Sequence, residues 1–149
     1  MANLKSNSTL GKTIAYWATT ILLCLPMIAG AVFDTMNPEE VAEGFARLGY
    51  PSYFPPMLGI AKGLGVLALL VPKFPRLKEW AYAGFTIDLI AAIVSHIAVE
   101  DPIGESVVPA VLLVILFASW WLRPAARRLP DVGELAAADP ATSDVAPAA

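Results

Sequence analysis

The chain has 149 residues, of which 57% are hydrophobic and only 15% are charged, and its mean hydropathy is +0.63. Soluble domains carry about 45–50% apolar and about 25% charged residues, so this composition excludes a disordered chain and an ordinary water-soluble domain. The net charge of −3 excludes a basic surface for nucleic acid, and the single cysteine, Cys24, excludes a disulfide scaffold and a cysteine-cluster metal site. We therefore predict an integral membrane protein with neither a metal site nor a nucleic-acid partner.

Four apolar stretches follow one another along the chain, and each is close to the roughly 20 residues that a membrane span requires. The first stretch also has features of a cleaved signal peptide, because Ala29, Gly30 and Ala31 imitate a cleavage site. Its 21 uncharged residues exceed the apolar length of a signal peptide, about 7–15 residues, so we predict a retained span. The predicted spans are residues 13–33, 53–71, 80–99 and 106–122.

These spans predict an all-α fold, a four-transmembrane-helix bundle over residues 13–124. Residues 1–12 precede it, and residues 125–149, rich in Ala, Pro and Asp, are predicted to form a disordered tail. Eight of the ten Lys and Arg residues lie before the first span, between the second and third, or after the fourth. Because basic residues collect on the cytoplasmic side, we predict that both termini are cytoplasmic and that the chain is a multi-pass protein of the cell (inner) membrane.

Residues 37–49, in the first outer loop, predict a short amphipathic helix. Asn37 is the expected N-cap, with Pro38 at the first helical position and Glu40 at the capping-box position. Apolar residues then recur at helical spacing, and Gly49 is the expected terminator. We expect this helix to lie on the outer membrane surface or over the bundle as a lid.

The stretch from Leu48 to Asp101 resembles the DoxX-like family of small bacterial membrane proteins, most closely in the phrases LGYP, LGIAKGLG, FPRLKEWAYAGF and SHIA. A looser resemblance covers residues 12–124. It implies a four-helix transmembrane bundle. Some related members are associated with quinone-linked sulfur or thiol oxidation, as subunits beside another protein. The resemblance supplies no set of catalytic residues.

Lys62 and Asp88 interrupt the second and third spans. A charge inside the bilayer costs at least a few kcal/mol, so such residues face the bundle interior, form pairs or line a pathway. Each lies roughly 12–14 Å from the cytoplasmic end of its span at 1.5 Å per residue. Because neighbouring spans run antiparallel, we predict that the two side chains meet as an ion pair. The pair either orients two helices or takes part in binding a substrate or a proton.

Small residues surround both charges on their helices. Gly59 and Gly63 form a G-x-x-x-G pattern beside Lys62, and Gly84 shares a helix face with Asp88. Small residues let membrane helices approach closely, so we predict that these glycines mediate helix packing. The opposite face of the third span, predicted to contact lipid, carries Leu89, Ile93 and Ile97.

Ser95 and His96, near the outer end of the third span, form a second candidate site. His96 has a reference pKa near neutrality, so it is a candidate for proton transfer; the alternative is an interfacial side chain bonded to a neighbour. Cys24 alone cannot form an intramolecular dithiol couple, and we interpret it as a packing residue.

Three functions remain compatible with these patterns. The first, which we favour, is an accessory subunit of a membrane redox system that contacts quinone between its helices and works beside a redox partner protein. The second is a small-solute or proton-coupled carrier, which would require a homo-oligomer. The third is a non-catalytic membrane assembly module. Whether the chain is itself catalytic is left open by the sequence.

Overall fold

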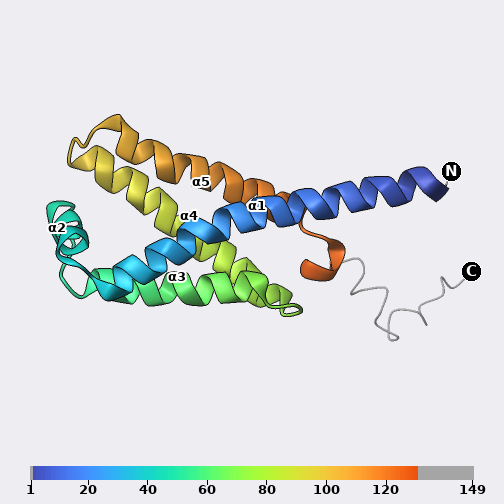
Figure 1. The fold of residues 1–149 in the computed structure, drawn as a ribbon, viewed down its shortest axis with the longest axis horizontal. Coiled ribbons are helices and arrows are strands. Elements are labelled where there is room, and N and C mark those ends of the chain that lie inside the picture. The colour runs from blue at the N-terminus through green and yellow to red at the C-terminus, as the bar shows by residue number, and fades with distance from the viewer. Residues whose placement is uncertain (1, 131–149) are drawn as a thin grey trace, which may run out of the picture.

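The computed structural model describes the backbone of residues 2–130 and the side chains of residues 10–130. The described chain is all-α, with four long helices, a short helix at one end of the bundle and a single 3-10 turn at the other (Figure 1). The elements are α1 (Ala2–Met36), α2 (Glu39–Arg47), α3 (Phe54–Leu70), α4 (Pro75–Ala98), α5 (Ile103–Leu122) and η1 (Ala125–Arg127).

The long helices run up and down the bundle in chain order. Both α1 and α4 pack against α3 and α5. The start of α1 and the turn η1 lie at the same end of the molecule, and α2 lies across the opposite end (Figure 1). Successive helices are therefore antiparallel neighbours.

Three of the described helices are long and apolar enough to cross a membrane: residues Leu10–Met36, Pro75–Ala98 and Ile103–Leu122. The fourth, α3, is apolar but has only 17 residues. Large apolar side chains cover the outward faces, with Leu64, Ile87 and Val114 each 61–70% exposed. Contiguous apolar surface of this kind requires an apolar environment.

The interior of the bundle combines apolar packing with a small hydroxyl network. Tyr16, Leu23, Leu69 and Leu116 are almost fully buried. Ser119 of α5 lies 2.7 Å from the Thr20 hydroxyl of α1 and 2.8 Å from the Tyr82 hydroxyl of α4. These bonds satisfy buried polar groups and link three helices at one level.

The predicted lipid face of α4 is wrong at Leu89, which is 3% exposed and belongs to the core. Ile93 is half-buried, whereas Ile97 is exposed as predicted. The physical reason is that α4 packs against two neighbours, α3 and α5, so it buries two faces rather than one.

The predicted N-cap at the junction between α1 and α2 is wrong. Asn37 does not cap α2: the helix begins at Glu39 behind Pro38, and no side-chain capping bond forms. Instead Asn37 adopts φ +47° and donates its backbone N–H to the Phe33 carbonyl, 2.9 Å away. A left-handed residue at this place ends the preceding helix, a role that Asn tolerates. At the other end of α2 the predicted terminator is confirmed, because Gly49 has φ +86°.

Buried Lys78 closes the turn between α3 and α4. Its ammonium donates to the carbonyls of Ala68 (2.8 Å) and Leu69 (3.1 Å), and also to Val71. A cation is favourable here because the last carbonyls of a helix lack intrahelical partners and carry partial negative charge. Arg127 of η1 donates to the same Leu69 carbonyl at 3.0 Å.

The predicted disordered tail is described only over residues 125–130. This part includes the turn η1, where Arg127 also stacks over the Trp17 ring, 4.6 Å from its centroid. The rest of the predicted tail, residues 131–149, lies outside the described residues.

Candidate functional site

Lys62 lies between two carboxylates contributed by two other helices. Its Nζ donates to Oδ2 of Asp34 on α1 at 2.9 Å and lies 3.7 Å from Oδ2 of Asp88 on α4. The three side chains are only 10–16% exposed. With all three groups ionised, the Asp34–Lys62–Asp88 triad carries one net negative charge.

The structure brings Lys62 and Asp88 together and adds Asp34, which sequence reasoning missed. The predicted first span, residues 13–33, ends one residue before Asp34, which leaves this residue in the outer loop. In the structure α1 continues to Met36, so Asp34 lies within the helix and is buried. The signal available in the sequence was the position of Asp34 directly after the apolar stretch 13–33, where less than one further turn of helix is enough to include it in α1.

A cavity of about 480 Å³ lies beside the triad and beneath α2. Its walls come from the end of α1, from α2, and from the facing sides of α3 and α4; Asp34, Lys62 and Asp88 all line it. This volume falls within the range of roughly 300–1,000 Å³ typical of small-molecule sites.

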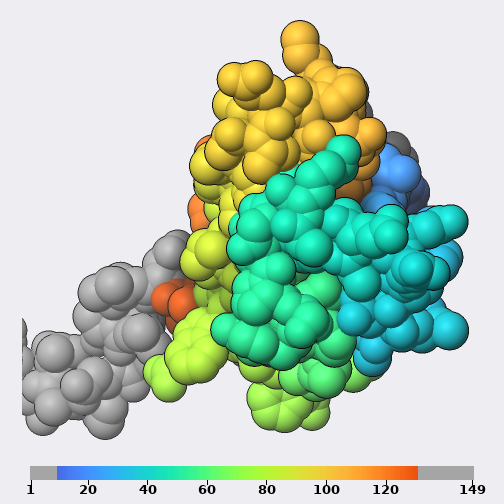
Figure 2. Space-filling model, turned by 90° about the vertical axis from the view of Figure 1, so that its left-hand side faces the viewer, coloured from blue at the N-terminus to red at the C-terminus, as the bar shows by residue number. Residues whose placement is uncertain are grey.

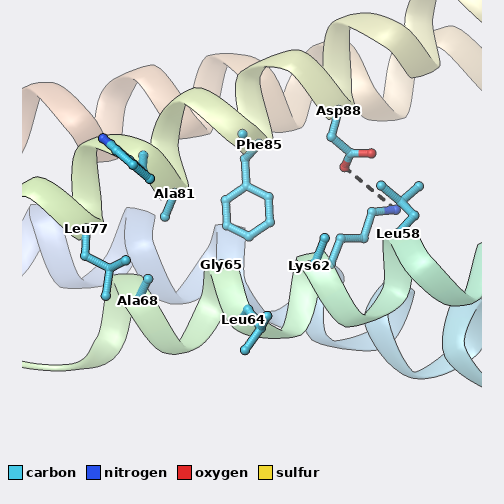
Figure 3. Close-up of a pocket in the computed structure, with 12 residues that line it drawn as sticks. Leu58, Lys62, Leu64, Gly65, Ala68, Leu77, Ala81, Phe85 and Asp88 are labelled. Carbon is cyan, nitrogen blue, oxygen red and sulfur yellow. Dashed lines mark ion pairs between the residues drawn. The ribbon is translucent and has the colours of Figure 1, made fainter.

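A second, apolar cavity of about 250 Å³ continues from the triad along the seam between α3 and α4. Figure 3 shows Lys62 and Asp88 pointing toward each other at one end, with Phe85 facing Gly65 further along. Leu77 and Ala68 lie near the other end in this view, and Trp80 also contributes to the lining. The two cavities share four residues: Leu58, Lys62, Gly84 and Asp88.

The predicted second site, Ser95 and His96, lines the cavity beneath α2, but each side chain has its own partner. The Ser95 hydroxyl lies 2.8 Å from the Tyr50 hydroxyl, and His96 Nδ1 lies 2.7 Å from Oδ2 of Asp101. Asp101 in turn pairs with Arg47 of α2 at 3.1 Å. These contacts attach α2 and the segment that follows it to the C-terminal end of α4, and Figure 2 shows α2 lying across this end of the molecule.

The three predicted packing glycines occupy different environments. A Cβ on Gly59 would lie 2.6 Å from the Thr35 backbone nitrogen and 2.7 Å from the Ala31 carbonyl oxygen, so α1 and α3 approach each other closely here. At Gly63 the nearest atom would be 3.9 Å away. Gly84 is not a packing residue: a Cβ there would meet nothing within 4 Å, because the residue faces both cavities.

Within the described residues, no group of three or more His, Cys, Asp or Glu could hold a metal ion. Cys24 lies in the core and is 3% exposed. The Asp34–Lys62–Asp88 triad can supply charge, hydrogen bonding and proton exchange next to an apolar seam.

A family model described as the DoxX-like family matches residues 18–119, which is more than half of the chain. The resemblance predicted from the sequence is thereby confirmed. Comparisons with curated proteins and with solved structures found no match.

Proposed function

This chain belongs to the DoxX-like family and is a membrane protein, and we propose that it is an accessory, quinone-associated subunit of a membrane redox system. The observation that carries the proposal is the combination of the Asp34–Lys62–Asp88 triad with an apolar seam that leads away from it between α3 and α4. A membrane-soluble ring with polar oxygens and an apolar tail has matching chemistry.

We further propose that the chain crosses the inner membrane four times. The fourth span is α3, whose 17 residues rise about 25 Å, close to the lower limit for a span. A chain with four spans returns to the side on which it began, so both termini lie on the same side of the membrane. The positive-inside rule predicts that this side is the cytoplasm. Basic residues collect there in the α3–α4 turn, in the first turn of α4 and after α5: Lys73, Arg76, Lys78, Arg123, Arg127 and Arg128.

The residues of the site fit a quinone. Lys62 would donate a hydrogen bond to a ring carbonyl in the cavity of about 480 Å³, and Asp88 would exchange a proton with a ring oxygen. Apolar side chains of the seam, including Leu77 and Trp80, would hold the tail. A bound quinone would supply two-electron, two-proton redox chemistry.

The role is an accessory one because the chain has one cysteine, which is buried. Oxidation of a thiol substrate through a dithiol couple would therefore need a partner protein that contributes the reacting sulfur groups. In this arrangement the membrane chain holds the acceptor, and the partner binds the substrate.

The decisive variant is Gly84→Leu, which fills the junction of the two cavities without removing a charge. We expect the wild-type protein in mild detergent to bind decylubiquinone. The variant should bind it at least roughly tenfold more weakly, a loss of about 1.4 kcal/mol or more in binding free energy. A binding titration that uses the quenching of tryptophan fluorescence as its signal measures the change in Kd.

The matched control is Gly104→Leu. Gly104 is also helical and has nothing within 4 Å of a Cβ position, but it lines neither cavity. It should bind decylubiquinone like the wild type. Failure of the wild-type protein to bind, or equal weakening in both variants, would contradict the proposal; uptake of a solute by proteoliposomes without quinone would favour the carrier.

A further inference from the structure

A third cavity, of about 650 Å³, lies where α5 ends, at the end of the bundle opposite α2. Three basic residues line it, Lys12, Arg123 and Arg128, and among the described residues of its lining the carboxylate is Glu79. Trp120 and Trp121 complete the polar and aromatic part of the wall. The proposed quinone site is separate, because the two cavities beside Lys62 have no lining residue in common with this third cavity.

Glu79 is already neutralised by its neighbours. Arg123 Nη1 lies 2.7 Å from its Oε1, and the Trp120 indole donates to its Oε2 at 3.1 Å. Arg123 is 4% exposed and stacks between the Tyr82 and Trp120 rings, 4.9 and 5.2 Å from their centroids. The charges of Glu79 and Arg123 therefore cancel within the wall of the cavity. The net positive charge of the described lining comes from Lys12 and Arg128.

Arg128 is held in a fixed position by the backbone. Its Nε donates to the Arg123 carbonyl at 2.7 Å and its Nη2 to the Trp121 carbonyl at 2.5 Å. Held by two carbonyls, the guanidinium keeps its positive charge in the wall of the cavity. Lys12 is exposed and supplies a second positive charge from α1.

We propose that this cavity binds the phosphate headgroup of an anionic phospholipid from the leaflet at this end of the bundle. Basic residues between helix ends attract anionic headgroups, and tryptophans favour the same interfacial depth. Exposed apolar side chains adjoin the cavity along the chain, Ile14 on α1 and Phe117 on α5, where acyl chains would lie. The bound lipid would bridge α1, α4 and α5.

The test measures binding of phosphatidylglycerol to the purified full-length protein in mild detergent, by the rise in its thermal unfolding midpoint. We expect phosphatidylglycerol to raise the midpoint and phosphatidylcholine to leave it unchanged. Lys12→Gln, at an exposed position, should retain the fold and weaken apparent binding about fivefold. The matched control is Lys73→Gln, which removes the same charge from an exposed position in the α3–α4 turn, outside the cavity.

Unchanged binding by Lys73→Gln together with weaker binding by Lys12→Gln would support the site. Equal weakening by both variants would mean that general surface charge attracts the lipid, which would overturn the proposal. An equal rise in the midpoint with phosphatidylcholine would mean that binding does not depend on the headgroup charge, and it would overturn the proposal as well. A full shift with millimolar inorganic phosphate alone would also overturn it, because the site would then take a free anion.

Discussion

Replacing Lys62 by methionine is expected to destabilise the protein by about 3–5 kcal/mol, the cost of leaving a buried charge without its partner. The expected loss is large because Lys62 is the cation that lies next to two carboxylates, Asp34 at 2.9 Å and Asp88 at 3.7 Å, and the three side chains are only 10–16% exposed. The free energy of unfolding in mixed micelles measures this change, and the amount of protein that accumulates in the membrane should fall with it. Lys73→Met is the control, because Lys73 is exposed in the turn between α3 and α4.

Adding a neutral residue at a carboxylate position should partly restore stability. Lys62→Met combined with Asp88→Leu removes one of the two uncompensated charges, so the double variant should be more stable than Lys62→Met alone. The coupling energy between positions 62 and 34 should exceed that between 62 and 88, because the Asp34 contact is the shorter, hydrogen-bonded one. Simple additivity at both pairs would mean that the triad does not exist.

Gly59→Ala should destabilise the bundle by about 1–3 kcal/mol, the usual cost of overpacking. The added methyl would lie 2.4 Å from the Thr35 hydroxyl and 2.7 Å from the Ala31 carbonyl oxygen, so α1 and α3 must separate. Thermal unfolding in detergent measures the loss.

Gly63→Ala, one turn further along α3, should have the opposite sign. Its methyl would meet its nearest neighbour, Ala31 Cβ, at the ordinary distance of 3.9 Å. Alanine is also a better helix former than glycine by up to about 1 kcal/mol. Equal destabilisation by the two substitutions would contradict the close approach at Gly59.

Most of the helical framework could be predicted from the lengths of the uncharged stretches between charged residues, because a charge inside the bilayer costs free energy. Equal depth on antiparallel helices was also enough to pair Lys62 with Asp88. Helix ends were harder to place. The predicted third span begins at residue 80, after the basic residue Lys78, whereas α4 begins at Pro75. Lys78 lies inside the helix and is buried against the end of α3, which its charge alone did not indicate.

The errors share one physical cause, which is that sequence periodicity describes one helix at a time. The predicted first span stops before Asp34 because the apolar stretch ends at residue 33, whereas α1 continues to Met36 and Asp34 contacts Lys62 of α3. Gly84 was expected at a helix contact because it is small, yet it faces a cavity. Both outcomes depend on the distance between neighbouring helices, which no single stretch of sequence contains.

If α3 crosses the membrane and carries Lys62 into its interior, both ends of the chain lie in the cytoplasm. Fusing a reporter that is active only in the cytoplasm, such as green fluorescent protein, and one that is active only outside it, alkaline phosphatase, to each terminus tests this most directly. Four spans predict fluorescent fusions and inactive phosphatase at both ends. Termini on opposite sides would leave three spans, remove α3 from the bilayer and contradict the account.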